Sequence, residues 1–427
     1  MKIAHFTDAY PPNVNGVAVV VEVFARKLSR EHQVEVYAPA YTGRGGVEKI
    51  GNLTIRRYRS VALPTYKDFR LAVPSVTGVA ESFEAFDPDV VHFHTPGPLG
   101  MLGILLSKSR KKSLVGTYHT LLSETLVYAS PKKLLEKYLP AIDRAASGLG
   151  VDLKLLGNGE NKNGGEQTLP QKMVWGLANR IYGYADVTLC PSQAIKREVI
   201  ARGMKGRVGV LSNGIELPKF PVKTEYKNRQ RILHTGRLGF EKNIGVVIKA
   251  FARVGQKYPD ARLTIAGDGP ARKELEKVTR DMVVEDKVRF LGMVKREKLA
   301  EIYREHDMFV TASAMETQGL VVLEAMASGL PVVAVNKYAL PDLVKNWRNG
   351  FLVGVGDDRG MASRIMKLIN DGTLTERMGR EARKTAGEHD LDKVIERLEE
   401  IYEQLPVCKD GGWWQRMKSR LGFNGWV

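Results

Sequence analysis

Residues 315–334, METQGLVVLEAMASGLPVVA, place two glutamates, Glu316 and Glu324, at the ends of an apolar run. A helix over this run would be buried on most of its surface, so Glu324 should face something other than hydrophobic core. If the helix begins near Gly319, its N-terminal N–H groups and positive dipole end can bind phosphate. The alternative is that Glu316 only leads into the helix and Glu324 lies on a half-exposed face.

On both sides of this stretch, short β-rich runs alternate with amphipathic segments. The predicted strands are residues 2–8, 32–39, 88–94, 113–120, 186–192 and 207–214, then 231–237, 261–269, 288–292, 308–313 and 331–335. Helices are predicted over 16–30, from about Gly245, over 271–279, near Lys298 and over the opening stretch. Strands that alternate with helices indicate βαβ units and parallel sheets. Two such series predict an α/β protein with two doubly wound, Rossmann-like domains.

The break between the two series sets the expected domain boundaries. Residues 1–215 should form the first domain and residues 216–387 the second. Residues 388–427 should form a helix that packs back toward the first domain, followed by a basic tail. Prolines and polar residues at 218–229 are typical of a hinge. The Gly- and Asn-rich segment 157–170 interrupts the alternation and is predicted to be a flexible surface loop with no assigned role.

The net charge of +17 and the isoelectric point of about 9.6 favour an anionic partner. Nucleic acid, lipid headgroups and phosphorylated substrates are the candidates, and solubility alone is the alternative. The sequence has no zinc-finger, RNP-like or basic-zipper motif, which argues against nucleic acid. Two distant cysteines, Cys190 and Cys408, give no disulfide framework and fit a reducing compartment. Asp8 interrupts the apolar core that a signal peptide requires, and no apolar run reaches the roughly 18 residues needed to span a bilayer. We therefore expect a cytoplasmic protein.

Residues 408–427 combine aromatic and basic side chains. The segment holds three of the five tryptophans, Trp413, Trp414 and Trp426, and also holds Arg416, Lys418 and Arg420. Tryptophan beside Arg and Lys is typical of a segment at a membrane interface. The segment therefore favours peripheral contact with the inner face of the cell membrane. The alternative is a tail whose tryptophans pack in a groove of the protein.

The segment LHTGRLGFEKN, residues 233–243, joins a predicted strand to a helix through a loop that contains two glycines and two cations. Gly236 lets the backbone approach a ligand, and Arg237 and Lys242 together can hold a diphosphate. Ligands of doubly wound sheets bind outside the carboxyl ends of the strands, where this loop lies. By themselves, Arg and Lys on a loop are more often simply solvated.

The ordered segments GRLGFEKN, AGDGP, FLGMV, ETQGLVVLEAMASGLPVVA and NGFLV resemble those of family 4 retaining glycosyltransferases. They span nearly all of the second domain. In the first domain, FTDAYPPNVNGVAVVVEVFARKL, HFHTPGPLGMLGILLSK and GTYHTLLSETLVYA are similar to the family's first strand, loop and helix and its later strands. The resemblance implies the GT-B fold, with two Rossmann-like domains facing across a cleft and a nucleotide-sugar donor held mainly by the second domain.

The resemblance also implies roles for individual residues. The diphosphate should be held by the cations of the 233–243 loop and by backbone N–H groups at the start of the helix, and the base by the backbone that follows FLG. Glu324 should hold the ribose, Glu316 the donor sugar, and His119 should lie beside the reacting sugar as a positioning group, not as a general base. The expected contacts are Gly16, Gly236, Arg237, Lys242, Met293, Val294, Glu316, Gly319, Leu320, Val321 and Glu324, and the catalytic residues His119, Glu316, Arg237 and Lys242. Many relatives have two adjacent glycines in the first loop, where this chain has Asn15 and Gly16.

The sequence predicts no metal site and no required cofactor beyond the nucleotide-sugar co-substrate. Asp87 and Asp89 form an Asp-x-Asp pair, but Pro88 and the strand that follows indicate a turn. His92 and His94 should point to one face of a strand, where packing is the commoner role. Arg237, Lys242 and the helix end would then neutralise the leaving diphosphate, and the retaining chemistry of the family needs no enzyme nucleophile.

Within the family, residues 63–75, 95–103, 117–128 and 316–320 are similar to diacylglycerol glucosyltransferases and related glycolipid synthases. The resemblance implies transfer of a hexose, expected to be glucose from a UDP-linked donor, to a membrane lipid. Basic residues at 107–112 and the amphipathic segment 131–139 could dock on anionic lipid. The alternatives are a family member with a soluble or glycan acceptor and a non-catalytic basic binding protein of the same fold.

Overall fold

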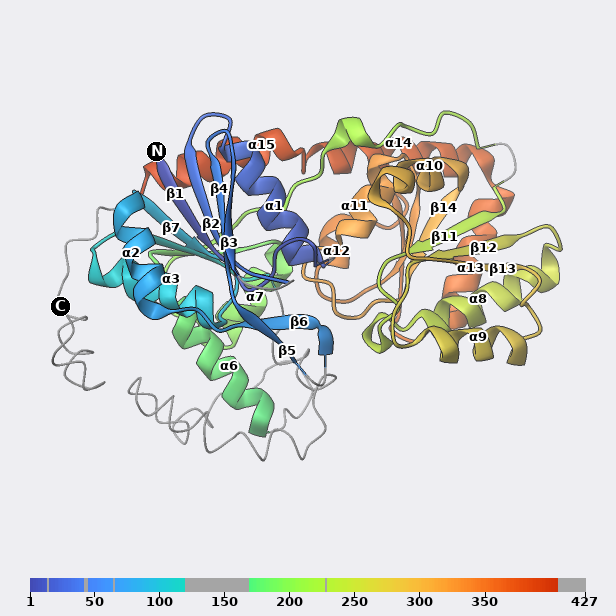
Figure 1. Ribbon diagram of the computed structural model, residues 1–427. Helices are drawn as coiled ribbons and strands as arrows, with labels where there is room; N and C mark the ends of the chain where they lie inside the picture. The colour runs from blue at the N-terminus through green and yellow to red at the C-terminus, as the bar shows by residue number, and fades with distance from the viewer. Residues whose placement is uncertain (14, 42–44, 64–65, 120–168, 227–228, 406–427) are drawn as a thin grey trace. The chain divides into compact units, whose positions relative to one another are not determined.

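The computed structural model describes residues 1–13, 15–41, 45–63, 66–119, 169–226 and 229–405 (Figure 1). The chain forms two compact units. Unit 1 comprises residues 1–211 with the chain from Ile395 onward, and unit 2 comprises residues 212–394. The expectations for segments 131–139, 157–168 and 408–427 lie outside the described residues. Within the described parts of the chain, every helix is too short or too polar to span a bilayer.

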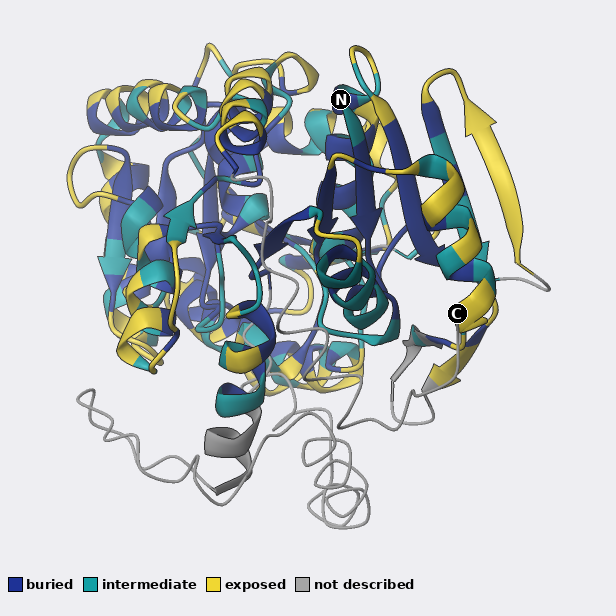
Figure 2. Ribbon diagram, turned by 90° about the vertical axis from the view of Figure 1, so that its left-hand side faces the viewer, coloured by how far each residue is buried: buried dark blue, intermediate teal, exposed yellow. Residues whose placement is uncertain are grey.

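Unit 1 is built on an eight-stranded sheet with the strand order β10-β9-β8-β7-β1-β2-β4-β3. All neighbours are parallel except β3 and β4. In Figure 2, β3 is exposed along its length, whereas the central strands are buried. The strands are β1 (Lys2–Phe6), β2 (Gln33–Pro39), β3 (Gly46–Ile50), β4 (Leu53–Tyr58), β7 (Val90–Phe93), β8 (Ser113–Thr117), β9 (Val187–Cys190) and β10 (Val208–Val210). A separate antiparallel pair consists of β5 (Ser60–Leu63) and β6 (Tyr66–Ala72).

The helices of unit 1 follow from local sequence signals. Asn15 caps the first helix, since its side chain accepts the Ala18 N–H at 2.8 Å. Gly103 allows α3 to approach β1, because a Cβ at this position would lie 2.6 Å from the Phe6 ring. The helices are α1 (Gly16–Leu28), α2 (Val76–Phe86), α3 (Pro98–Ser109), α6 (Leu169–Tyr182), α7 (Gln193–Ala201) and the greater part of α15 (Leu391–Glu403).

Unit 2 has a six-stranded, all-parallel sheet with the order β13-β12-β11-β14-β15-β16. In chain order within the unit this is 3-2-1-4-5-6, the doubly wound arrangement whose direction reverses between β11 and β14. The strands are β11 (Arg231–Thr235), β12 (Arg262–Ala266), β13 (Val288–Gly292), β14 (Met308–Thr311), β15 (Val332–Val335) and β16 (Gly350–Val353). The carboxyl ends of these strands lie at one edge of the sheet, where ligands of such folds bind.

The helices of unit 2 connect these strands. They are α8 (Ile244–Lys257), α9 (Arg272–Asp281), α10 (Arg296–Glu305), α11 (Leu320–Ala327), α12 (Leu340–Leu343), α13 (Asp358–Asn370) and α14 (Gly372–Gly387), with 3-10 turns η2 (Leu217–Lys219) and η3 (Phe240–Lys242). The prediction of two parallel, doubly wound sheets is confirmed. The sequence did not indicate the hairpins β3–β4 and β5–β6, because they lack the long apolar runs of the central strands.

Asp8 is a buried carboxyl group at the carboxyl end of β1. It accepts hydrogen bonds from Thr95 Oγ1 at 2.8 Å and from the N–H groups of Leu99 and Gly100 at 3.2 and 3.5 Å, at the start of α3. Burial raises the pKa of Asp8 to about 6, although these hydrogen bonds lower it. The folded chain therefore binds the Asp8 proton more tightly than the unfolded chain. This contribution to stability is present at low pH and is lost as the pH rises from about 4 to 6.

We expect Asp8→Asn, which removes this titration, to gain stability relative to the unmodified chain as the pH rises. The difference in the free energy of unfolding should increase by about 2 kcal/mol between pH 4.5 and 7.5 and stay constant above that pH. Urea unfolding at a series of pH values measures it. Asp260→Asn, which removes an exposed carboxyl of unit 2, is the matched control. A difference in the free energy of unfolding for Asp8→Asn that does not vary with pH would contradict a raised pKa of Asp8.

Candidate active site

The candidate site of unit 2 lies where the strand order reverses, at the carboxyl ends of β11 and β14. The loop after β11 contains Gly236, Arg237 and Lys242, and the loop after β14 contains Glu316 and leads to Gly319. These two loops are 70 to 80 residues apart in the sequence. The two parallel strands bring them together, as the doubly wound fold predicts.

An ion pair joins the two loops. Lys242 Nζ lies 2.7 Å from Glu316 Oε1, and the two side chains are only 23% and 14% exposed. Burial lowers the pKa of Lys242, but the adjacent Glu316 carboxylate outweighs it and leaves that pKa raised. Burial likewise raises the pKa of Glu316, and the Lys242 ammonium outweighs it and leaves that pKa lowered. Both groups are therefore charged at neutral pH, in a region of reduced solvent contact.

The remaining groups of the β11 loop surround this pair. Arg237 is exposed, and its charge lowers the pKa of Lys242 against the effect of Glu316. Gly236, with φ of +132°, comes directly after β11. His234 is buried, donates its Nδ1 hydrogen to the Val310 carbonyl at 2.9 Å, and has its pKa lowered by burial to about 4. The predicted diphosphate contacts Arg237 and Lys242 thus occupy one loop, with two positive charges close together.

The helix α11 begins directly after Gly319, as the sequence predicted. Gly319 has φ of +88°, a left-handed conformation that glycine adopts without a steric penalty. The N–H groups of Leu320 and Val321 belong to the first turn, where a helix offers donors that it cannot pair internally. The adjacent Gln318 is buried and fixes the turn, because its amide accepts the Asn213 N–H at 2.9 Å and donates to Ser212 Oγ at 2.5 Å.

Glu324 lies in the second turn of α11 and is held by a tyrosine of α10. Tyr303, which is fully buried, donates its hydroxyl hydrogen to Glu324 Oε2 at 2.8 Å. The single hydrogen of that hydroxyl serves Glu324 and, at 3.3 Å, the Val321 carbonyl, so Thr235 Oγ1 is the donor to the Tyr303 hydroxyl in the contact at 2.6 Å. Burial raises the pKa of Glu324, although this hydrogen bond lowers it. One carboxylate oxygen is thereby fixed while the other can accept from a ligand.

The predicted base contacts and the predicted contacts of unit 1 lie at further strand ends. Met293, 63% exposed, and Val294 follow β13. Gly16 is the first residue of α1, and the departure Asn15 has the local role of capping that helix. His119 is buried just beyond β8, with Nε2 lying 3.0 Å from His94 Nδ1.

Several expectations about neighbouring residues can be compared with the structure. Asp87 and Asp89 lie in the connection between α2 and β7: Asp87 ends α2 in a left-handed conformation and Asp89 accepts the Lys2 N–H at 2.8 Å. In the basic segment 107–112, three cations are paired with carboxylates, which reduces the net positive charge of that segment. The pairs are Lys108–Asp186, Arg110–Glu84 and Lys112–Asp87.

Sequence reasoning missed the residues that hold the predicted ones in place. Tyr303, Gln318 and His5 were not singled out. Gln318 lies inside the quoted motif, and His5 lies on a predicted strand beside the His-x-His pair, so both had a signal. Tyr303 had none, because only the packing of α10 on the sheet brings it to Glu324.

We expect Lys242→Met to lower the free energy of unfolding by about 1–3 kcal/mol at pH 7.5, because it leaves the Glu316 carboxylate without its countercharge. The deficit should shrink toward pH 5, since a carboxyl whose pKa is now raised is protonated more readily in the folded chain. The double variant Lys242→Met/Glu316→Gln should be more stable than Lys242→Met alone. Urea unfolding measures all three, with the exposed Lys249→Met as control. Equal losses in the single and double variants would show that the pair does not contribute.

Two family models match adjacent parts of this chain. The model described as Glycosyltransferase Family 4 matches residues 14–219, and the model described as Glycosyl transferases group 1 matches residues 218–385. The two matches together cover most of both units. They divide the chain close to the point where the first parallel sheet ends and the second begins.

Similar proteins include curated sugar-transferring enzymes and a solved structure in complex with UDP-glucose. The alpha-monoglucosyldiacylglycerol synthase of Streptococcus pneumoniae is 28% identical over 88% of this chain and 82% of its own length. The sulfoquinovosyl transferase of Arabidopsis thaliana is 28% identical over 91% of this chain and 71% of its own length. The structure of Anabaena HepE in complex with UDP-glucose is 20% identical, has a TM-score of 0.67, and covers 95% of this chain and 100% of that chain. The chain belongs to the family 4 glycosyltransferases and is a hexosyltransferase with the GT-B fold.

Proposed function

We propose that this enzyme transfers glucose from UDP-glucose to a membrane lipid such as diacylglycerol, with retention of configuration and without a required metal ion. The arrangement of side chains around Gly319 is the observation that supports the assignment of a nucleotide-sugar donor. Glu316 lies on the loop that leads to α11 and pairs with Lys242 of the loop after β11, while Glu324, in the second turn of α11, is held by Tyr303 of α10. The site therefore offers cationic and N–H groups that suit a diphosphate, and beside them a carboxylate that suits a ribose.

Each group of unit 2 has a proposed part in donor binding. Arg237, Lys242 and the N–H groups of Leu320 and Val321 supply positive charge and hydrogen bonds to the diphosphate, with Gly236 allowing close approach. Lys242 has three hydrogens, so it can keep Glu316 in place while donating to a phosphate oxygen. Glu324 accepts from the ribose hydroxyls through the oxygen that Tyr303 does not hold. The backbone of Met293 and Val294 meets the base.

We propose a same-face displacement as the reaction. The bond between the sugar anomeric carbon and the diphosphate oxygen breaks as the acceptor oxygen bonds to the same face of that carbon. The acceptor proton passes to the leaving diphosphate. The charge that develops on the diphosphate is stabilised by Arg237, Lys242 and the α11 N-terminus, and Glu316 and His119 position the sugar. Gly16 in unit 1 approaches the phosphates.

The lipid acceptor is supported by the similarity, over most of the chain, to enzymes named alpha-monoglucosyldiacylglycerol synthase. The net charge of +17 suits contact with an anionic bilayer. A soluble or glycan acceptor is the alternative, since the donor half of the site would be the same. A non-catalytic binding role is disfavoured by the similarity to glycosyltransferases over most of the chain.

The deciding experiment combines purified full-length protein with vesicles that contain anionic lipid and diacylglycerol. UDP-glucose, UDP-galactose and GDP-mannose are each supplied with lipid or soluble acceptors, in buffer containing EDTA, and products are identified by mass spectrometry. We expect a lipid-linked hexose of retained configuration, formed best from UDP-glucose and reduced by at least about a hundredfold in Glu316→Gln. Product on a soluble acceptor alone would reject the lipid assignment, and loss of activity in EDTA would reject the metal-independent reaction.

We expect Tyr303→Phe to raise KM for the nucleotide sugar about three- to tenfold while kcat changes less than about twofold, because it loosens the carboxylate that meets the ribose. Steady-state kinetics with the donor identified above measure both constants. Tyr258→Phe is the matched control, since it removes a tyrosine hydroxyl that bonds to Asn370 at 2.8 Å on an exposed part of the same unit. A fall in kcat with unchanged KM would place Tyr303 in the chemical step instead.

A further inference from the structure

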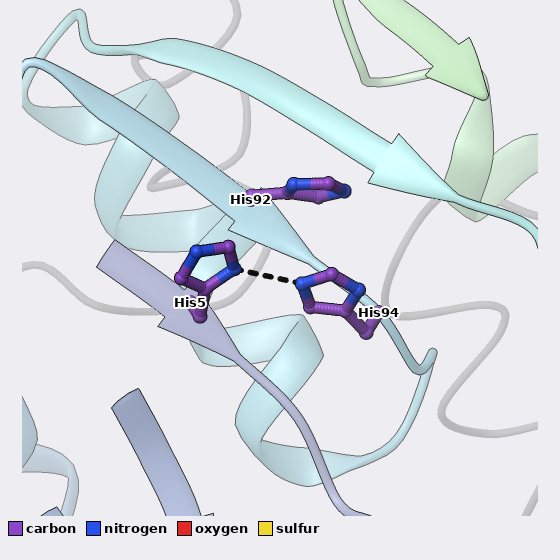
Figure 3. A group of neighbouring side chains, drawn as sticks. All are labelled: His5, His92 and His94. Carbon is purple, nitrogen blue, oxygen red and sulfur yellow. Dashed lines mark hydrogen bonds between the residues drawn. The ribbon is translucent and has the colours of Figure 1, made fainter. Parts of the chain in front are cut away.

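Unit 1 contains two groups of polar side chains to which the proposed reaction gives no role. The first is a buried group of imidazoles: His5 on β1, His92 on β7 and His94 directly after β7 (Figure 3). His5 Nδ1 lies 2.8 Å from His94 Nε2, and His92 bonds through both nitrogens, to the Tyr402 hydroxyl and to Thr117 Oγ1. Burial lowers the pKa of His5 to about 3 and holds the pKa of His92 and of His94 well below its usual value. This group is uncharged at neutral pH, and these hydrogen bonds are internal to the unit.

The second group lies at the carboxyl edge of the unit 1 sheet and consists of Arg57, Arg70 and Tyr41. Tyr41 comes two residues after the end of β2, and Arg57 is the next-to-last residue of β4, which pairs with β2 in parallel. Arg70 belongs to β6, and each of the three side chains is half-buried. Ligands of doubly wound sheets bind outside the carboxyl ends of the strands, so this edge suits a ligand.

Backbone carbonyls and an aromatic ring hold the guanidinium of Arg57. Its Nη1 donates to the Pro11 carbonyl at 2.8 Å and to the Pro39 carbonyl at 3.5 Å, and its Cζ lies 5.5 Å from the centroid of the Tyr10 ring. These partners fix the group but carry no net negative charge. Among the described residues, the Nε and Nη2 hydrogens of Arg57 have no acceptor.

Arg70 is held in a similar way by a serine and a second ring. Its Nε donates to Ser60 Oγ at 2.8 Å and its Nη2 donates to the Ser60 carbonyl at 3.0 Å. Ser60 Oγ donates in turn to the Ala40 carbonyl, next to Tyr41. The Arg70 Cζ lies 5.9 Å from the centroid of the Tyr41 ring. The Nη1 hydrogens of Arg70 have no acceptor in the parts of the chain that the structure describes.

The Tyr41 hydroxyl lies within the field of both arginines. Asn13 Nδ2 donates to this hydroxyl at 2.9 Å, so the hydroxyl hydrogen itself can be donated to another acceptor. Burial raises the pKa of Tyr41, whereas the hydrogen bond from Asn13 and the positive charges of Arg70 and Arg57 lower it. Two guanidinium groups and a hydroxyl hydrogen are therefore gathered at one edge of the sheet.

The positive charge of this group is not balanced by a carboxylate. In the part of the chain that the structure describes, neither arginine of the group forms an ion pair, whereas the adjacent Arg56 pairs with Glu35 at 2.7 Å. Asp8, whose charge also acts on Tyr41, is already held by Thr95 and by N–H groups of α3. Charged side chains that are partly removed from water are normally paired, because an uncompensated charge is costly. An anion from outside the chain would supply the missing partner.

We propose that Arg57, Arg70 and the Tyr41 hydroxyl bind a phosphate group of a ligand. A phosphate has several acceptor oxygens and a charge that two guanidinium groups balance, and guanidinium groups bind such oxygens in pairs. The same oxygens are present on a lipid headgroup and on a soluble phosphate ester. The inference goes beyond the proposed transfer reaction, because diacylglycerol has no phosphate and the residues that are proposed to hold the donor diphosphate by charge belong to unit 2.

The test compares two probes that carry the same phosphate monoester. They are sn-glycerol 3-phosphate in solution and phosphatidic acid in phosphatidylcholine vesicles. The full-length protein is studied with UDP in the buffer, so that the diphosphate-binding residues proposed in unit 2 are occupied. Calorimetry measures the Kd of the soluble probe, and co-sedimentation measures the Kd of the vesicles. Arginine-dependent binding of the soluble probe would support a soluble phosphate ester as ligand, and such binding of the vesicles alone would support a lipid headgroup.

Single substitutions connect binding to the proposed site. We expect Arg57→Gln and Arg70→Gln each to raise the Kd about tenfold or more, and Tyr41→Phe to raise it about two- to fivefold. Arg30→Gln removes the same charge from an exposed position between α1 and β2, at the opposite edge of the sheet. This control should change the Kd by less than about twofold, because an exposed charge is screened by solvent and salt.

The outcome does not depend on the transfer reaction, because the measured quantity is binding. If Arg57→Gln does not fold, Arg70→Gln and Tyr41→Phe still test the site, since both leave Arg57 in place. Failure of both probes to bind would overturn the proposal. An equal change of Kd in Arg70→Gln and in Arg30→Gln would also overturn it, because the probe would then respond only to net charge.

Discussion

The parallel arrangement of the strands is the constraint on which both candidate sites depend. Parallel strands end at the same edge of a sheet, so loops that are far apart in the sequence meet there. In unit 2, this places the loop after β11 beside the loop after β14 at the point where the strand order reverses. In unit 1, the same constraint places the residues after β1, β7 and β8 next to one another, and these include Asp8, His94 and His119.

The two units use this edge with different electrostatics. The site of unit 2 retains charge: Lys242 and Glu316 form an ion pair at 2.7 Å, and Arg237 adds a second cation. Such an arrangement is costly to bury but is already ordered before an anionic ligand arrives, which reduces the reorganisation that binding requires. In unit 1, burial lowers the pKa of His5 and of His94, which are uncharged at neutral pH, and raises the pKa of Asp8.

The sequence predicted the two doubly wound sheets and offered candidate site residues in the loops between strands and helices. The central strands were recognisable because parallel strands buried on both faces are nearly continuous apolar runs, as in residues 308–313 and 331–335. Glu316, Gly319 and Lys242 were recognisable because glycines and charges in strand-to-helix loops have few structural reasons to be there. The strand β3 was not recognisable from the sequence, since it is exposed along its length and its residues do not alternate between apolar and polar. The link from Tyr303 to Glu324 could not be predicted, because it depends on how α10 packs on the sheet.

The hydrogen-bonded chain of His5, His94 and His119 was only partly predictable from the sequence. The period of two placed His92 and His94 on one face, but their significance depends on which strand is their neighbour. With β1 beside β7, His5 becomes the register partner of His92, and with β8 on the other side, His119 comes within hydrogen-bond distance of His94. Three residues that separately look like core packing then form one hydrogen-bonded chain with His94 at its centre. Burial lowers the pKa of His5 and of His94 within that chain, an effect that the three positions in isolation do not predict.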